Sequence, residues 1–379
     1  MGLVLNPDQQ LIRDTAKDFC TANAPIAQLR ALRDNGSDDG FDRATWRQMV
    51  DLGWPGIIFP EALDGTGFGY LGLGLILEES GRTLTASPLF ATVVLGGSAL
   101  LLGGTEAQKQ TLIPKVIAGE TLFAFAAEEG PHHAPYQVAT RARRNATGYV
   151  VNGRKVFVFD GHVADTLIVV ARTSGSDDAR DGLTLLLVAA DAPGVTRRRT
   201  LMADSRNAAV IEFANVQVAA EQVLGSADAG ADLLDAVLDR ARICLAAEML
   251  GSAQEAFDRT MAYLRERKQF GVVIGSFQGL KHRAAELYCQ LELGRSAVLE
   301  ALTALDERPA DAAQLACLAK AKLNEIFHRA SNEAVQMHGG IGMTDAFDIG
   351  FFMKRARVCE QAFGDVAFHL DRCASLDGY

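Results

Sequence analysis

The sequence predicts an α+β fold in which a helical N-terminal domain (residues 1–120), a β-domain (121–226) and a C-terminal four-helix bundle (227–379) follow one another. Apolar residues recur at helical spacing before residue 120 and again after residue 226. Short β-like runs separated by turn residues fill the middle of the chain. The length of 379 residues allows two or three domains, and only ten prolines occur, which suits a mostly helical protein.

The N-terminal domain is expected to begin with a helix after Asn6. Asn6 is a favourable N-cap, Pro7 suits the first helical position, and Gln9 follows three residues after the cap. Gly67-Phe-Gly-Tyr-Leu-Gly72 matches the dinucleotide-binding pattern GxGxxG, but that motif requires a preceding strand, and a helical segment precedes it here. We therefore interpret these glycines as a loop between helices. Further helices are predicted at 44–52, 72–82, 91–103 and 105–118.

The β-domain is indicated by apolar runs at 148–158, 167–171, 183–188 and 210–218. Asn152-Gly153 divides the stretch 148–158 into two shorter β-like runs and predicts a hairpin turn between them. Because no helical stretch separates neighbouring strands, we expect an antiparallel barrel or sandwich rather than a βαβ unit. Arg197-Arg-Arg199 is interpreted as a solvated turn, with attraction of a phosphorylated ligand as the alternative. Pro131 and Pro135 place His132-His133 in a loop, and no metal site is expected.

Composition excludes several classes of function. The 37 basic and 47 acidic residues give a formal net charge of −10, which argues against nucleic acid or an anionic membrane as the main partner. No secretory signal and no apolar stretch of ~20 residues is found, so no membrane span is expected. Six scattered cysteines without a CxxC pair indicate reduced thiols, and we expect a cytoplasmic protein.

Two segments of the C-terminal region carry the most specific chemistry. Gly271 and Gly275 interrupt a long helical pattern and place Arg267, Gln269 and Phe270 at the break. An arginine there can fork onto a phosphate, and an aromatic side chain can pack against a ring. In the second segment, Gln336-Met-His-Gly-Gly-Ile-Gly, the glycines at a helix end let backbone N–H groups approach a ligand.

These motifs, RxQFG…IxxFQ…H and QxHGGxG, together with the helix–β–helix order, resemble those of the acyl-CoA dehydrogenase family. The similarity extends over nearly the whole chain. Nitroalkane oxidases and flavin monooxygenases share this fold, so a related flavin oxidase or monooxygenase is a further alternative. Supporting segments lie at 52–61, 78–82 and 161–172.

The resemblance implies an FAD-dependent enzyme in which FAD takes a hydride from the β-carbon of an acyl-CoA while a carboxylate removes the α-proton. It implies electron-transfer flavoprotein as acceptor and a homo- or hetero-oligomer, a dimer or tetramer, with FAD at a subunit interface. Arg242 would lie on the substrate side. The residues expected to contact the FAD of a neighbouring chain are Arg267, Gln269, Phe270, Phe277 and Gln278, and those expected to hold its ADP portion are Gln336, Gly339 and Gly340.

The sequence departs from the family where the flavin ring and the catalytic base are expected. Residues 127–133 lack the Thr and Ser of the family's T-E-P-G-x-G-S signature, and Phe157-Val-Phe159 lacks the later Thr. The usual Glu-Gly of the base corresponds to Phe363-Gly364, and the alternative position corresponds to Ala241. The remaining candidates are Asp365, which could instead cap a helix, and Glu248, which could instead be a buried structural acid.

Two functions therefore remain open. The first is an FAD-dependent acyl-CoA dehydrogenase with a non-standard or missing base. The second is a non-catalytic partner subunit of a heteromeric acyl-CoA dehydrogenase that donates FAD-binding residues to its neighbour. Relatives with split sites in steroid-degrading systems resemble this chain in a tail of Phe363-Gly-Asp followed by His369 and Arg372.

Overall fold

The computed structural model describes residues 4–379 and contains two compact units. The first consists of the chain up to Ala31, Tyr70–Thr85 and Arg242–Tyr379, and the second of Leu32–Gly69 and Ala86–Ala241. The N-terminal helices are thus divided between two units, and the β-domain belongs to the second. The mixed α+β class predicted from the sequence is confirmed.

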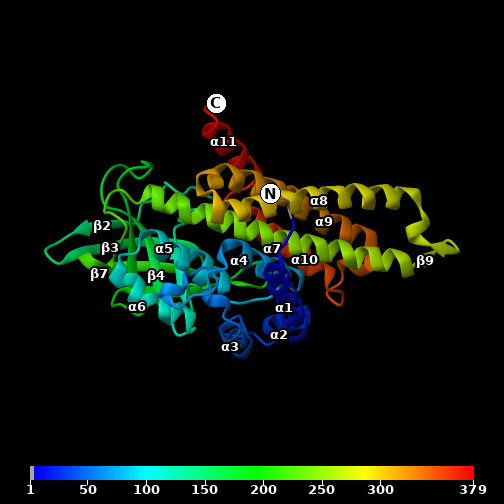
Figure 1. Ribbon diagram of the computed structural model, residues 1–379, viewed down its shortest axis with the longest axis horizontal. Helices are drawn as coiled ribbons and strands as arrows, with labels where there is room; N and C mark the ends of the chain where they lie inside the picture. Colours follow the sequence, from blue (N-terminus) through cyan, green and yellow to red (C-terminus); the bar gives the residue numbers. More distant parts are fainter. Residues whose placement is uncertain (1–3) are drawn as a thin grey trace. The chain divides into compact units, whose positions relative to one another are not determined.

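Long helices dominate the first unit. α1 begins at Pro7, and the predicted cap is present, because the Asn6 side chain accepts from the backbone N–H of Gln9 at 2.8 Å. In the C-terminal region α9 packs against α8, α10 and α11, as expected of a bundle (Figure 1). The helices that lie wholly or partly in this unit are α1 (Pro7–Asn23), α2 (Ile26–Asp34), α4 (Gly69–Arg82), α7 (Ala231–Glu266), α8 (Gln278–Glu307), α9 (Ala312–His338), α10 (Ile349–Gln361) and α11 (Val366–Leu376).

α4 and α7 cross with their backbones in direct contact. A Cβ atom built on Gly251 would lie 1.7 Å from the carbonyl oxygen of Glu78, and one on Gly81 would lie 2.1 Å from that of Glu248. The hydroxyl of Ser252 donates to the carbonyl of Gly81 at 2.8 Å. Only glycine permits this approach, so these two positions fix how the helices pack.

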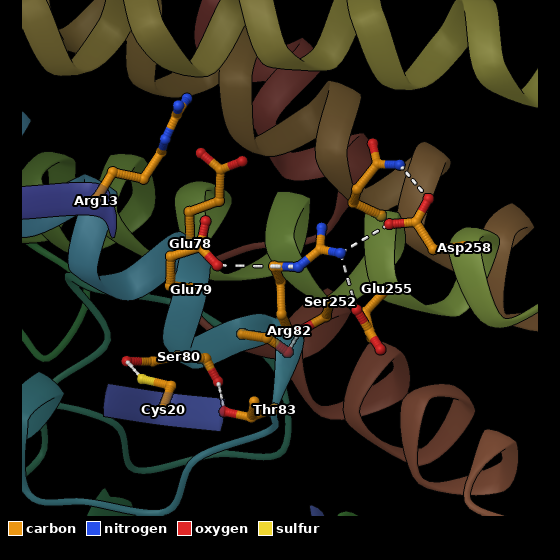
Figure 2. A network of polar contacts seen from close by, with 12 residues as sticks. Arg13, Cys20, Glu78, Glu79, Ser80, Arg82, Thr83, Ser252, Glu255 and Asp258 are labelled. Atoms are coloured by element: carbon orange, nitrogen blue, oxygen red, sulfur yellow. Dashed lines mark hydrogen bonds and ion pairs between the residues drawn. The ribbon is translucent and has the colours of Figure 1, made fainter. Parts of the chain in front are cut away.

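A polar network adjoins this crossing (Figure 2). The guanidinium of Arg82 lies 2.9 Å from a carboxylate oxygen of Glu255 and 2.7 Å from one of Asp258. Burial, together with the neighbouring carboxylate of Glu78, raises the pKa of Glu79 to about 6. The network therefore holds one carboxyl group that titrates in mildly acidic solution.

In the second unit the helices expected near 44–52, 91–103 and 105–118 are present. They are α3 (Arg43–Asp51), a π-helix (Phe90–Gly97) continued by α5 (Ser98–Gly103), and α6 (Glu106–Ile117). Gly67 and Gly69 have positive φ values of 68° and 70° and form the turn that leads into α4. The GxGxxG match thus follows a short 3-10 helix (Glu61–Leu63) rather than a strand, as expected, but Gly72 lies inside α4, so the loop interpretation holds only for the start of the match.

The sheet of the second unit has the strand order β6-β7-β3-β2-β4-β5-β8, and β1 pairs with β4. Its inner face carries a continuous apolar core. Most pairings are antiparallel as expected, but β1 and β2 each pair parallel with β4, which corrects the purely antiparallel prediction. The strands are β1 (Phe123–Ala126), β2 (Arg141–Arg144), β3 (Gly148–Phe159), β4 (Thr166–Arg172), β5 (Leu183–Ala189), β6 (Val195–Leu201), β7 (Asn207–Ala219) and β8 (Val223–Leu224).

Two local predictions in this sheet are wrong. Asn152-Gly153 lies inside β3 at a β-bulge, where Gly153 has φ 151° and a Cβ would lie 2.6 Å from the Cα of Thr140. The turn before β3 instead uses Asn145, whose side chain accepts from the N–H of Gly148 at 2.8 Å. Arg197–Arg199 form part of the edge strand β6 rather than a turn, and charged residues protect such an edge from further pairing.

Candidate functional site

The helix break predicted around Gly271 is a short hairpin between α7 and α8. Strands β9 (Lys268–Gln269) and β10 (Val272–Val273) pair antiparallel, with Phe270 and Gly271 in left-handed conformations (φ 53° and 79°). The side chain of Phe270 is 90% exposed and meets the ring of Phe277 edge to face at 6.2 Å. Arg267, Gln269 and Gln278 are exposed as well. The hairpin lies at one end of the bundle (Figure 1), and the side chains of Arg267, Phe270 and Phe277 are exposed on it.

The second predicted segment lies at the end of α9. α9 ends at His338, and Gly339 leaves the helix with φ 64°. A Cβ atom built on Gly339 or Gly340 would meet nothing within 4 Å, and both residues are exposed together with Gln336. The turn is therefore on the surface, although the N–H of Gly339 donates to the carbonyl of Gln336, and its binding of a ligand remains a prediction.

A stack of rings joins the two segments within the first unit. The His338 ring lies 4.4 Å from that of Tyr263, on the last turns of α7, and 4.9 Å from that of Phe347. The residues of the two predicted FAD-contacting groups therefore belong to one connected structure. Sequence reasoning did not single out this contact.

The position of the usual family base is a buried turn between α10 and α11. Phe363 has φ 58° and its carbonyl accepts from Nε of Arg242 at 3.1 Å. The ammonium of Lys320, on α9, donates to the carbonyls of Cys359 and Gly364 at 2.9 and 3.1 Å. Burial lowers the pKa of Lys320 to about 7. Two buried basic side chains thus hold this turn by its carbonyl groups.

The two candidate bases make other contacts. Glu248 forms a buried, bidentate ion pair with Arg355, with Nε and Nη2 at 3.1 and 3.0 Å from its two carboxylate oxygens. Asp365 is the N-cap of α11 and accepts from the backbone N–H of Phe368 at 2.9 Å. A catalytic role for either remains a prediction.

The loop of residues 127–133, in the second unit, is held by its own charged groups. His133 Nδ1 lies 2.5 Å from a carboxylate oxygen of Glu128. The fully buried Lys155 donates to the carbonyl of Ala127 at 2.9 Å and to Glu129 at 2.7 Å. The loop that lacks the family's Thr and Ser therefore has an internal polar network of its own.

Phe157 and Phe159 belong to the segment that lacks the family's later Thr on the expected flavin side. Phe157 has φ 50° and is 52% exposed, and Phe159 meets Phe90 edge to face at 6.5 Å. These rings offer no hydroxyl group for a hydrogen bond.

Models of all three domains of acyl-CoA dehydrogenases match this chain: the N-terminal domain over residues 6–120, the middle domain over 124–216 and the C-terminal domain over 228–375. The chain belongs to the acyl-CoA dehydrogenase family. It is 34% identical to the probable acyl-CoA dehydrogenase YngJ of Bacillus subtilis (strain 168) over 95% of each chain. The family consists of FAD-dependent oxidoreductases that act on acyl-CoA, so FAD is the cofactor.

Solved structures agree with this assignment. A variant of the Tcur3481–Tcur3483 steroid ACAD is 29% identical, with a TM-score of 0.88 over 98% of this chain and 97% of that chain. The ChsE4–ChsE5 complex from Mycobacterium tuberculosis is 26% identical, with a TM-score of 0.90 over 100% of both chains.

Two further findings concern residues 4–379. None of the helices in that range is both long enough and apolar enough to cross a membrane. Within the same range, no group of three or more His, Cys, Asp or Glu side chains is placed to hold a metal ion.

Lys320 and Lys155 were missed as site residues because their partners are distant in sequence. For Lys320 one signal was available. It occupies the apolar stripe of α9 formed by Ala316, Leu323 and Phe327, all buried. A lysine at such a position is expected to be buried with specific hydrogen-bond partners.

Proposed function

We propose that this chain is a subunit of a heteromeric acyl-CoA dehydrogenase that contributes FAD-binding residues to a homologous partner and no catalytic base of its own. The observation that carries the proposal is the set of contacts made at the candidate base positions. By the sequence comparison with the family, Phe363 falls at the base position; Glu248 pairs with the buried Arg355, and Asp365 caps α11.

The chemistry of the reaction explains why these contacts matter. When bound, FAD supplies the acceptor for the hydride, and the protein must remove the α-proton. A base needs an accessible carboxylate whose pKa lies near the working pH. A carboxylate that accepts two hydrogen bonds from a buried guanidinium is stabilised as the anion, which makes it a weak base. Glu248 in its pair with Arg355 therefore fits a structural role.

The face that would serve a neighbour's FAD has the opposite character. Arg267 is exposed and can fork onto a pyrophosphate, and the exposed Gly339–Gly340 turn has open space on its Cβ side into which a ligand can approach the backbone. The side chain of Phe270 is 90% exposed, so a molecule that covers it would bury apolar surface and be bound more favourably. These residues fit a cofactor held at an interface, where the family resemblance puts FAD.

The flavin-ring side of this chain fits the cofactor less well. Ala127 and Phe159 cannot donate the hydrogen bonds that hydroxyl groups would supply. The carboxylates of Glu128 and Glu129 are paired with His133 and Lys155. We propose that the ring is held by the partner subunit and that the substrate is an acyl-CoA thioester. Electron-transfer flavoprotein remains the proposed electron acceptor.

Two of the similar structures support an assembly of unlike chains, since one is the ChsE4–ChsE5 complex and the other is the Tcur3481–Tcur3483 steroid ACAD. Their names also make a steroid-derived acyl group worth including among the substrates tested.

The test compares the chain alone with a complex. We expect the purified chain to carry little flavin and to give no dye reduction with straight, branched or steroid acyl-CoAs. Co-expression with a homologous acyl-CoA dehydrogenase chain is expected to give a yellow, active complex. One flavin per chain and turnover by the isolated chain would refute the proposal, and loss of that turnover in Asp365→Asn would then identify the base. Flavin binding without reduction by acyl-CoA would call for assays with dioxygen.

Arg267→Ala tests the donated residue in that complex. We expect it to lower flavin occupancy while the complex remains assembled. Arg329→Ala is the matched control, because Arg329 lies on α9, away from the hairpin, and pairs with Glu286 at 2.7 Å.

A further inference from the structure

The ring of His338 packs against two aromatic rings from different parts of the first unit, and these two rings lie 6.5 Å from each other. Tyr263, from α7, stacks on it at 4.4 Å with an interplanar angle of 28°, and Phe347, from the segment before α10, lies at 4.9 Å. Only 3% of His338 is exposed. Three rings in mutual contact fix one another's positions more firmly than a single pair does.

One ring nitrogen of His338 is bonded and the other is not. Nδ1 lies 2.7 Å from the carbonyl oxygen of Ala334, so this nitrogen carries the proton and donates it. Nε2 is then an acceptor, and it is buried without a hydrogen-bond partner among residues 4–379. Burial also lowers the pKa of His338, which keeps the ring neutral. An unsatisfied buried acceptor disfavours folding, so stability alone does not explain this histidine.

The stack links the ends of two helices. Tyr263 lies in the last turns of α7, and its carbonyl accepts from the N–H of Arg267 at 2.9 Å. His338 directly precedes Gly339, and a Cβ built on Gly342 would lie 3.0 Å from the Cβ of His338. A displacement of the His338 ring would therefore disturb both the Arg267 hairpin and the glycine turn.

We propose that His338 is a positioning residue whose ring, packed in one cluster with Tyr263 and Phe347, sets the Gly339–Gly340 turn relative to the Arg267 hairpin. The inference rests on the proposed function only for what the two segments bind, the FAD of a partner subunit. The coupling between the segments belongs to this chain and can be measured without a cofactor.

Hydrogen exchange of the full-length chain tests the coupling. His338→Ala removes both stacking contacts, and we expect backbone amides of 268–275 and of 339–344 to exchange about tenfold faster. His338→Phe keeps an aromatic ring and is expected to restore wild-type exchange in both segments. His328→Ala, at a partly exposed histidine of the same helix, is expected to change neither segment.

A change confined to 339–344 in a folded His338→Ala chain, or no change at all, would overturn the inference. If His338→Ala does not fold, Tyr263→Ala removes the stack from the other side and must give the same two-segment response. In the assembled complex, FAD binding is expected to weaken about tenfold in His338→Ala and to be normal in His338→Phe. If Arg267→Ala also leaves FAD binding unchanged, the proposed function fails, and the exchange data still decide the coupling.

Discussion

The lysine buried beneath the turn between α10 and α11 allows a quantitative prediction. Lys320 has no exposed surface and donates to Asn324 Oδ1 at 2.7 Å and to the carbonyls of Cys359 and Gly364. Lys320→Met retains most of the side-chain volume and removes all three hydrogen bonds. In the variant the carbonyl of Gly364 keeps a weaker hydrogen bond from Asn324 at 3.4 Å. The loss of the Lys320 hydrogen bond is therefore expected to be more costly at the carbonyl of Cys359.

The free energy of unfolding is expected to fall by about 3 kcal/mol at pH 9. This estimate takes about 1–3 kcal/mol for each buried acceptor that loses its donor, and the neutral amine at pH 9 has two N–H groups, so two acceptors are counted. At pH 9 the wild-type amine is neutral in the folded state, because burial lowers the pKa of Lys320 from 10.5 to about 7. At this pH, therefore, neither the wild-type protein nor the variant buries a charge at position 320.

The sign of the pH dependence follows from this shift. Between pH 7 and 10.5 the unfolded chain binds the Lys320 proton and the folded chain does not, so wild-type stability rises with pH in that window. Lys320→Met lacks this contribution. The difference between the two proteins should therefore shrink by up to about 1.4 kcal/mol per pH unit from pH 9 towards pH 7, and level off below pH 7.

The assay is urea unfolding followed by circular dichroism at pH 6, 7, 8 and 9. Lys322→Met is the matched control, because Lys322 is a partly exposed lysine on the same helix that donates to Gln290 at 2.7 Å. We expect it to change stability by less than about 0.5 kcal/mol at every pH. A stability difference for Lys320→Met that is constant, or that grows as the pH falls, would refute the reasoning.

Three further substitutions test other parts of the first unit. Gly251→Ala places a methyl group 1.7 Å from a backbone oxygen of α4, so thermal melting should show a loss of about 3 kcal/mol or more, whereas Gly279→Ala, in open space, should be tolerated. Glu79→Gln removes a carboxyl group whose pKa is raised by burial from 4.5 to about 6. Between these two pH values the folded wild-type protein binds more protons than its unfolded chain does, so its stability falls as the pH rises. In melting experiments, the stability of the wild type relative to the variant should therefore decline from pH 4.5 to pH 6. Glu248→Gln removes the carboxylate that pairs with the buried Arg355, and the free energy of unfolding measured in urea should fall by about 3 kcal/mol. A variant that is fully stable but abolishes turnover of the complex would instead favour Glu248 as the base.

The helical part of the fold could be predicted because its signals are local. The Asn6 cap, the glycine break at Gly271 and the glycine end of α9 each depend on residues within a few positions of one another. Long helices also repeat their apolar stripe many times, which makes their existence easier to predict than that of short strands. The exposed residues at these helix ends were therefore identified from sequence.

Strand pairing could not be predicted in the same way. Asn152-Gly153 has the composition of a hairpin turn, yet β7 continues to pair with β3 through a bulge at this point, and the partner residues lie some 60 positions away in the sequence. Asn145 makes the real turn through side-chain hydrogen bonds that are as local as those of Asn6. Tertiary pairing thus overrode one local signal and used another.

The candidate site shows the same division. Arg267 and Gly339 are recognisable because exposure at a helix end is a local property. Lys320, Arg355 and His338 acquire their roles from partners on other helices, so sequence spacing alone could not assign those roles.

The turn at Phe363 sharpens the proposed division of labour between subunits. A left-handed backbone conformation costs a non-glycine residue of the order of 1–2 kcal/mol, and two buried basic side chains hold this turn in place. A turn without any role would gain stability by relaxing to an ordinary conformation. The turn is present without a carboxylate, and this is explained if the turn still shapes the apolar surroundings of an active site. Proton removal would then be carried out by a carboxylate of the partner subunit. We therefore expect the partner subunit to carry a carboxylate at the position that corresponds to Phe363.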